Sequence, residues 1–159
     1  LLKNKELISG VIYEPNQDEM FYAWKNGGAY LNGKSISVSS TKKISNALLA
    51  TGFPYYDYKR LDDYLNVLKW LMHNSRGIRR IGSAAIDLAY VACGRFDAFY
   101  EYSLNPWDVA AGAIIVKEAG GSVKDFEGGE NYMFGREILA SNLHVESEFL
   151  DKIKHFFLS

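Results

Sequence analysis

Short apolar runs separated by turn residues dominate the first 40 positions of the chain. They predict strands over residues 6–13, 20–24, 29–31 and 34–38, with Pro15 to Asp18 and Asn26-Gly27-Gly28 as turns. Asn32-Gly33 is the dipeptide favoured in two-residue type I′ hairpins, because both residues tolerate a positive φ. Because the gaps between the runs are short, we expect an antiparallel meander.

After Thr41 the hydrophobic pattern changes to strands that alternate with helices. Leu61, Leu65 and Leu68, for example, recur at helical spacing. The pattern predicts strands over residues 47–51, 78–81, 97–101, 122–125 and 138–141, and helices over 59–73, 84–92, 107–119 and 145–157. Such alternation is typical of βαβ units, so we expect a layered α/β fold with helices on the faces of the sheet.

The meander at the start of the chain cannot close a core alone, since a few strands with one apolar face need more strands or a covering helix. We therefore predict two parts. Residues 1–40 would be the end of an incomplete amino-terminal sheet layer, and residues 41–159 a carboxyl-terminal α/β domain.

Composition and charge narrow the class of protein. The 159 residues are 48% apolar, enough to bury a core without disulfides. With 18 basic and 19 acidic residues, the chain has no strong overall attraction for nucleic acid or an anionic membrane surface. No apolar run approaches the roughly 20 residues that span a bilayer. The single cysteine, Cys93, excludes an internal disulfide framework and fits a reducing, cytoplasmic location.

Asp108 is the first candidate for chemistry. Asn105-Pro106 is a strong helix start, so Asp108 falls in the first helical turn, just beyond the carboxyl end of a predicted strand. Ligands bind at that edge of α/β sheets. The alternative is that Asp108 only complements the helix dipole, which stabilises a helix by about 0.3–1 kcal/mol.

Glu101 ends the preceding strand, seven residues before Asp108. The intervening loop can bring both carboxylates to one cleft, where such a pair holds a divalent cation or orients substrate hydroxyls. The alternative is an ordinary solvated residue at a strand end.

The segment from Arg79 to Ala85 is the third candidate. Free N–H groups at a helix start attract anions and hydroxyls, and Gly82 lets the backbone approach a ligand closely. The alternative is that Ser83 is an ordinary N-cap.

The remaining reactive or aromatic residues give no further site. The three histidines lack metal-ligand spacing, and Cys93 has no matched base, so we expect it in the core. Tyr55, Tyr56 and Tyr58 are expected to lie on a loop that packs on the core rather than to form a surface patch.

Taken together, these segments resemble the carboxyl-terminal portion of the inositol monophosphatase family, the lithium-sensitive, Mg-dependent sugar-phosphate phosphatases. The resemblance is carried in order by Gly82-Ser83-Ala84-Ala85-Ile86-Asp87-Leu88, Asp97-Ala98-Phe99-Tyr100-Glu101, Pro106-Trp107-Asp108-Val109-Ala110-Ala111-Gly112 and Glu118-Ala119-Gly120-Gly121. Upstream, Gly10 to Pro15 and Gly27 to Gly33 also match the family. The resemblance implies the layered α-β-α-β-α sandwich of the sugar phosphatases.

The resemblance also implies roles for single residues. Asp108 matches an aspartate that ligates a catalytic metal and touches substrate, and Glu101 matches a carboxylate that contacts substrate hydroxyls. Thr51 and Gly52 follow a strand that approaches the same pocket. The positions assigned to substrate binding are Arg79, Gly82, Ser83, Ala84, Glu101 and Asp108.

The activity implied by the resemblance is Mg-dependent hydrolysis of a small phosphate monoester, myo-inositol monophosphate first, by metal-activated water. Two or three Mg ions, inhibition by Li and a homodimer are implied in the same way. The alternatives left open are a fructose-1,6-bisphosphatase, a nucleotide 3′-phosphatase, an NADP phosphatase, or a non-catalytic fragment or binding module.

The family's upstream metal motifs, Glu-Glu and Asp-Pro-Ile/Leu-Asp-Gly-Thr, do not occur in these 159 residues. The chain also begins at Leu1 without an initiator Met. We therefore expect the carboxyl-terminal half of a phosphatase, whose partner is its missing amino-terminal half. Asp108 alone cannot hold a catalytic pair of Mg ions, because each needs near-octahedral oxygen coordination, so the 159 residues by themselves should be inactive.

Overall fold

The first sheet is the predicted antiparallel meander. In the computed structural model, which describes residues 1–158, its strands are β3 (Ser9–Glu14), β4 (Glu19–Trp24), β5 (Ala29–Leu31) and β6 (Lys34–Ile36), in that order. A small hairpin of β1 (Leu2–Lys3) and β2 (Glu6–Leu7) precedes it. The single strand predicted over residues 6–13 is thus divided, because Ile8 changes partner. Its N–H donates to the carbonyl of Leu1, while its own carbonyl accepts from Lys25.

The second sheet has the order β10-β11-β9-β7-β8. Its strands are β7 (Leu48–Thr51), β8 (Gly77–Arg79), β9 (Ala98–Tyr102), β10 (Ser122–Lys124) and β11 (Glu137–Ser141). Strand β7 is parallel to both β8 and β9, whereas β11 is antiparallel to both β9 and β10. Strands β7 to β10 therefore share one direction, and their carboxyl ends meet at one edge, as the predicted βαβ units require.

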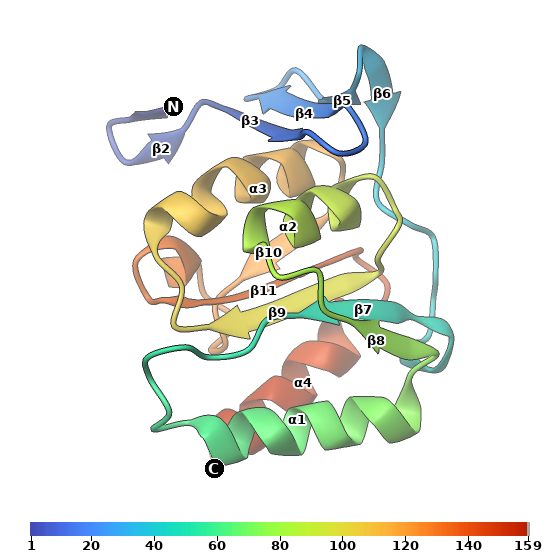
Figure 1. Cartoon of the computed structure of the whole chain (residues 1–159), viewed down its shortest axis with the longest axis vertical. Helices are drawn as coiled ribbons and strands as arrows, with labels where there is room; N and C mark the ends of the chain where they lie inside the picture. The colour runs from blue at the N-terminus through green and yellow to red at the C-terminus, as the bar shows by residue number, and fades with distance from the viewer. Residues whose placement is uncertain (159) are drawn as a thin grey trace.

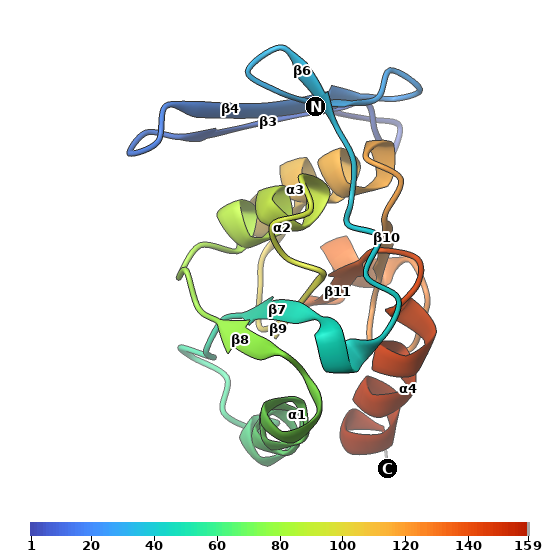
Figure 2. The ribbon, with the colours of Figure 1, turned by 90° about the vertical axis from the view of Figure 1, so that its right-hand side faces the viewer.

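Four helices separate and cover the sheets (Figures 1 and 2). They are α1 (Leu61–Asn74), α2 (Ala84–Ala92), α3 (Pro106–Glu118) and α4 (Glu146–Phe157), and the short 3₁₀ turns are η1 (Ile44–Asn46) and η2 (Asn131–Met133). Helices α2 and α3 lie between the two sheets, and α1 and α4 lie on the far face of the second sheet. All four helices were predicted, with ends that differ by no more than two residues.

Close backbone contacts hold the inner layers together. A β-carbon on Gly10 of β3 would lie 2.8 Å from the α-carbon of Ala111 in α3. One on Gly112 of α3 would lie 2.5 Å from the β-carbon of Leu88 in α2. These glycines let the first sheet and both helices pack around one apolar core, in which Phe21 and Leu88 are fully buried.

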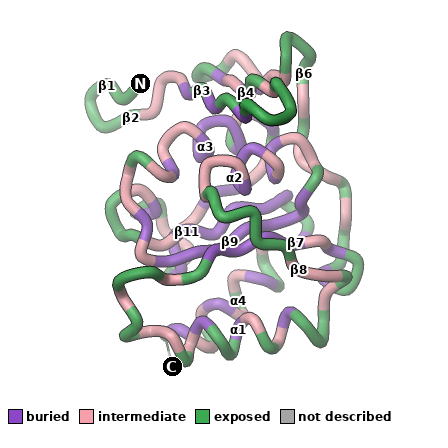
Figure 3. Tube along the Cα trace, in the orientation of Figure 1, coloured by how far each residue is buried: buried purple, intermediate pink, exposed green. Residues whose placement is uncertain are grey.

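The outer face of the first sheet is apolar and aromatic. Tyr22, Trp24 and Tyr30 stack there with ring centroids 5.3 to 6.3 Å apart. Val11 and Tyr13 beside them are 61% and 51% exposed. In Figure 3 the trace of this sheet changes repeatedly between buried and exposed colours. No helix within residues 1–158 covers this face (Figure 1).

The layers present are thus β-α-β-α, four of the five in the expected α-β-α-β-α sandwich, and the fold prediction is confirmed. Both predicted parts, 1–40 and 41–159, contribute to the core between the sheets, and their status as separate domains stays a prediction. Over the described residues, every helix is too short or too polar to cross a membrane.

Candidate active site

A cavity of about 430 Å³ opens where neighbouring parallel strands send the chain to opposite faces of the second sheet. After β7 the chain continues to α1 on one face, and after β9 it continues to α3 on the other (Figure 2). Such a switch point creates a crevice at the carboxyl ends of the strands, where α/β proteins bind ligands. The cavity is lined by Gly52, Phe53, Pro54, Tyr55, Tyr56, Gly82, Ser83, Ala84, Ala85, Glu101, Tyr102, Ser103, Leu104, Asn105, Trp107 and Asp108.

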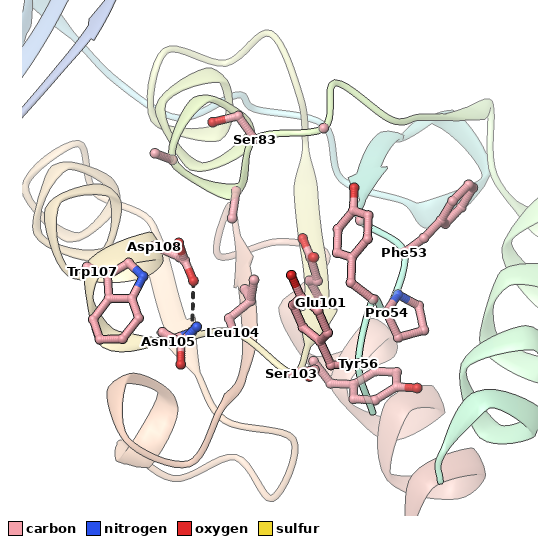
Figure 4. Close-up of a pocket in the computed structure, with 16 residues that line it drawn as sticks. Phe53, Pro54, Tyr56, Ser83, Glu101, Ser103, Leu104, Asn105, Trp107 and Asp108 are labelled. Atoms are coloured by element: carbon pink, nitrogen blue, oxygen red, sulfur yellow. Dashed lines mark hydrogen bonds between the residues drawn. The ribbon is translucent and has the colours of Figure 1, made fainter. Parts of the chain in front are cut away.

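Glu101 on β9 forms the centre of one wall (Figure 4). It is only 6% exposed, so the interpretation as a solvated strand-end residue is wrong. Burial raises the pKa of its carboxyl to about 8, and the neighbouring carboxyls of Asp87 and Asp108 raise it as well. The positive charge of Arg80 acts in the opposite direction and lowers this pKa. Such a carboxyl keeps its proton near neutral pH, so it can donate as well as accept a hydrogen bond.

The carboxyl group of Glu101 lies against the backbone of Gly52, the residue that follows β7. A β-carbon on Gly52 would lie 2.1 Å from the carboxyl carbon of Glu101. A side chain at position 52 would therefore force the carboxyl group of Glu101 to move. The two strands at the switch point therefore fix Glu101 together.

Asp108 lies in the first turn of α3, where the helix-start interpretation is confirmed and ligand binding stays a prediction. The N–H of Asn105, the N-cap residue, donates to Oδ2 of Asp108 at 2.9 Å. The N–H of Asp108 donates in turn to the carbonyl of Asn105 at 3.0 Å. The carboxylate thus stabilises the helix start and also lines the cavity opposite the Phe53–Tyr56 loop, leaving Oδ1 for a ligand.

The start of α2 forms the third part of the wall. Gly82 turns the chain with φ +91°, a conformation that favours glycine. Ser83 occupies the N-cap position, but its hydroxyl makes no capping hydrogen bond, so the prediction of an ordinary cap is wrong. Its hydroxyl and the unpaired amides of the first turn remain available to a ligand in the cavity.

Two residues predicted near the site lie outside the cavity lining. Arg79 is exposed, and its Nη1 donates to the carbonyl of Ile78 at 3.0 Å. Thr51 is buried, and its hydroxyl donates to the carbonyl of Tyr100 at 2.8 Å. Thr51 therefore joins β7 to β9, whereas the adjacent Gly52 lines the cavity.

Asp87 is a buried carboxyl that was not predicted as a site residue. It lies in α2, fully buried, and neither of its oxygens has a hydrogen-bond partner among the described residues. Burial raises its pKa to about 7, and the positive charge of Arg80 offsets part of that rise. The signal was an acidic residue within an otherwise small and apolar helix, Ala84–Ala92.

An aromatic rim surrounds the cavity. Tyr55 and Tyr56 line it while remaining 56% and 90% exposed, and Tyr58 is 59% exposed. The prediction that these three tyrosines pack on the core is therefore wrong. Trp107, 78% exposed, lies on the opposite wall beside Asp108 (Figure 4). Phe53 to Tyr56 come just after β7 and Gly52, and this position beyond a strand end was the available signal for a ligand-binding loop.

The donor set for a metal ion is incomplete. Within residues 1–158, no three or more His, Cys, Asp or Glu side chains come together as a metal site. Asp108 already uses one of its oxygens for the N–H of Asn105. A magnesium ion prefers six oxygen ligands, so these residues supply at most part of a magnesium site.

The comparison with known proteins covers nearly the whole chain. A family model described as the inositol monophosphatase family matches residues 1–155. The chain is 48% identical over 138 residues to a protein of Pseudomonas aeruginosa named Nus factor SuhB, covering 86% of this chain and 51% of the relative. It is 44% identical over 144 residues to the Escherichia coli protein of the same name, covering 91% and 54%. The chain thus spans about half the length of these relatives.

Solved structures agree with the sequence relatives. The extragenic suppressor protein suhB of Bartonella henselae superposes with a TM-score of 0.91 at 40% identity, covering 96% of this chain and 58% of that protein. An inositol monophosphatase of Anabaena superposes with a TM-score of 0.87 at 39% identity, covering 93% and 59%.

Proposed function

Because this chain belongs to the inositol monophosphatase family, we propose that it forms the substrate-selecting wall of a phosphatase acting on a small phosphate monoester. The observation that carries the proposal is the switch-point cavity. There Glu101, Asp108 and the start of α2 converge from three separate elements. The preferred substrate is myo-inositol monophosphate, whose ring hydroxyls suit a buried, protonated carboxyl.

In this proposal, one end of the cavity binds the alcohol part of the substrate and the other end binds the metal ion. Glu101 hydrogen-bonds hydroxyls of the alcohol, and Gly82, Ser83 and Ala84 line the space around it. Asp108 contributes one oxygen ligand to Mg²⁺, and the other protein ligands come from outside residues 1–158. A carboxylate oxygen is a hard ligand that suits Mg²⁺, and this ion usually keeps several water molecules among its ligands. Two or three ions, and inhibition by Li, belong to the same proposal.

A second segment of the same protein is the proposed partner. The chain spans 51% and 54% of its curated relatives, and a stacked aromatic face of the first sheet lies open. We propose that an upstream segment covers this face and brings the missing metal ligands to the cavity. A homodimer and a cytoplasmic location complete the proposal.

The direct test is phosphate release by the full-length protein. Myo-inositol 1-phosphate should be hydrolysed in Mg²⁺, and the activity should disappear in EDTA. A panel containing fructose 1,6-bisphosphate, a nucleotide 3′-phosphate and NADP distinguishes the alternative phosphatases by their relative kcat/KM. Hydrolysis that continues unchanged in EDTA would refute the metal-dependent function.

A binding role is the second candidate, favoured by the name Nus factor that the relatives from P. aeruginosa and E. coli carry. It predicts a folded full-length protein that releases phosphate from none of the esters in the panel.

A further inference from the structure

An irregular segment, residues 53–58, leads from Gly52 at the cavity towards helix α1 and is named the aromatic loop here (Figure 1). Its first four residues line the cavity. Phe53 and Tyr56 lie on the same side of the cavity as Glu101, whereas Asp108 lies on the other side (Figure 4). The position of the aromatic loop therefore sets the shape of the cavity around Glu101.

A buried hydroxyl group of strand β9 holds this loop. The hydroxyl of Tyr102 donates a hydrogen bond to the carbonyl of Asp57 at 2.9 Å. Tyr102 is only 4% exposed. Its ring packs against Tyr64 of α1 and Phe157 of α4, with ring centroids 6.2 and 6.0 Å away. Because both outer helices contact the ring, the hydroxyl is fixed in place before it meets the loop.

Tyr102 directly follows Glu101 on β9, so the two side chains point to opposite faces of the second sheet. Glu101 reaches the cavity, and Tyr102 joins the apolar cluster beneath α1 and α4 while its edge also lines the cavity. The chain from β7 to α1 passes on the face of Tyr102 (Figure 2). The end of one strand thus positions a substrate-binding carboxyl with one residue and the adjoining wall with the next.

The other hydrogen bonds of the aromatic loop do not attach it to the sheet. The hydroxyl of Tyr58 donates to the carbonyl of Tyr55 at 2.9 Å, a contact within the loop. Arg80 donates from Nη2 to the hydroxyl of Tyr55, but Arg80 is exposed and lies in the connection between β8 and α2. Within residues 1–158, the hydrogen bond from Tyr102 is therefore the link between this loop and the second sheet.

We propose that Tyr102 is a positioning residue for substrate binding, which holds the aromatic loop against the alcohol part of the substrate through the carbonyl of Asp57. The proposal rests on the proposed function, since it takes the cavity as the substrate site. The loop borders the Glu101 side of the cavity and not the Asp108 side. Loss of the hydrogen bond should therefore weaken substrate binding and leave the Mg²⁺ dependence unchanged.

The kinetic test is Tyr102→Phe in the full-length protein, which removes the hydroxyl and keeps the packed ring. KM for myo-inositol 1-phosphate should rise about fivefold, while kcat and the Mg²⁺ concentration for half-maximal rate stay at the parent's values. Glycerol 2-phosphate, whose alcohol has no ring and reaches less of the loop, should show a smaller rise.

Tyr100→Phe is the matched control for this variant. Tyr100 lies two residues earlier on β9, outside the cavity lining, and its buried hydroxyl has no hydrogen-bond partner among the described residues. Tyr100→Phe should keep the parent's KM. An unchanged KM in Tyr102→Phe, an equal rise for both substrates, or an equal rise in Tyr100→Phe overturns the proposal.

Hydrogen exchange of the full-length protein tests the loop without relying on catalysis. In Tyr102→Phe the amides of residues 53–60 should exchange about fivefold faster, with unchanged exchange in α1 and α4. If no ester is hydrolysed but this pattern holds, the phosphatase function fails and Tyr102 still positions the loop. Unchanged exchange in the loop, or an equal acceleration in α1 and α4, would show that Tyr102 has no specific positioning role.

Discussion

At the scale of single residues, the shape of the cavity depends on a missing side chain and on a hydroxyl that makes no capping hydrogen bond. Glu101 is positioned by the lack of a side chain at Gly52, and Ser83 lines the cavity because its hydroxyl caps no helix. The sequence indicated Glu101, Asp108 and Ser83 through their places at strand and helix ends. It could not indicate how deeply Glu101 is buried or that Asp87 lacks a partner, because both depend on packing between distant segments.

Gly52→Ala tests the contact that positions Glu101. The added methyl group would overlap the carboxyl group, so Glu101 must move. We expect kcat/KM for inositol 1-phosphate to fall about 100-fold, the cost of displacing a substrate-contacting group by about 1 Å. Gly77→Ala is the control, because its β-carbon would meet its nearest neighbour at an ordinary 3.5 Å. Equal activity in the two variants would contradict the positioning role of Gly52.

Asp87→Asn tests the buried carboxyl through the pH dependence of stability. Burial raises the pKa of Asp87 from 3.8 to about 7, so the folded protein keeps a proton that the unfolded chain loses between these values. Stability must therefore fall as pH rises through this window. Asparagine cannot ionise, so Asp87→Asn removes this pH-dependent contribution. Between about pH 5 and about pH 8, the free energy of unfolding in urea should fall by a few kcal/mol less in Asp87→Asn than in the parent protein.

Glu101 contributes in the same direction, because its pKa is also raised, so the variant should reduce the pH dependence without abolishing it. Asp151→Asn, on the exposed surface of α4, is the control and should leave the parent's slope unchanged. Identical slopes in Asp87→Asn and the parent protein would show that Asp87 is ionised in the folded state.

At the scale of elements, the period of the hydrophobic pattern predicted every helix and most strands. Helix α3 was recognised because Asn105, Pro106 and Asp108 each favour a helix start by a different local mechanism. Strand β11 was recognised as a strand, but its antiparallel direction was not, because direction depends on the route of residues 125–136 and leaves no periodic signal. The exposure of Tyr55, Tyr56 and Tyr58 was misjudged because large aromatic side chains are often buried in a core.

The open aromatic face of the first sheet leads to a prediction about the element that covers it. Residues 1–159 produced alone should bind the dye ANS through Tyr22, Trp24 and Tyr30, and Trp24→Thr with Tyr30→Thr should weaken that binding. In the full-length protein the face should be covered, and dye fluorescence should be low. Equal fluorescence from both forms would show that no upstream segment packs there.

At the scale of the whole molecule, two sheets and four helices bring the carboxyl ends of β7, β8 and β9 to one edge. The cavity forms there because β7 and β9 send the chain to opposite faces. The sequence predicted this edge as the ligand site, together with a layered α/β fold. The four layers and the incomplete donor set agree with a chain that spans about half the length of its relatives.

The central claim is that, in one cavity, Asp108 binds the metal ion and Glu101 hydrogen-bonds the hydroxyls of the alcohol part of the substrate. The most direct measurement is the initial rate of phosphate release from myo-inositol 1-phosphate by the full-length protein, recorded across Mg²⁺ and substrate concentrations for Asp108→Asn and Glu101→Gln. Asp108→Asn should raise the Mg²⁺ concentration for half-maximal rate at least about tenfold, whereas Glu101→Gln should raise KM and keep the parent's Mg²⁺ dependence. A parent-like Mg²⁺ dependence in Asp108→Asn would contradict the account.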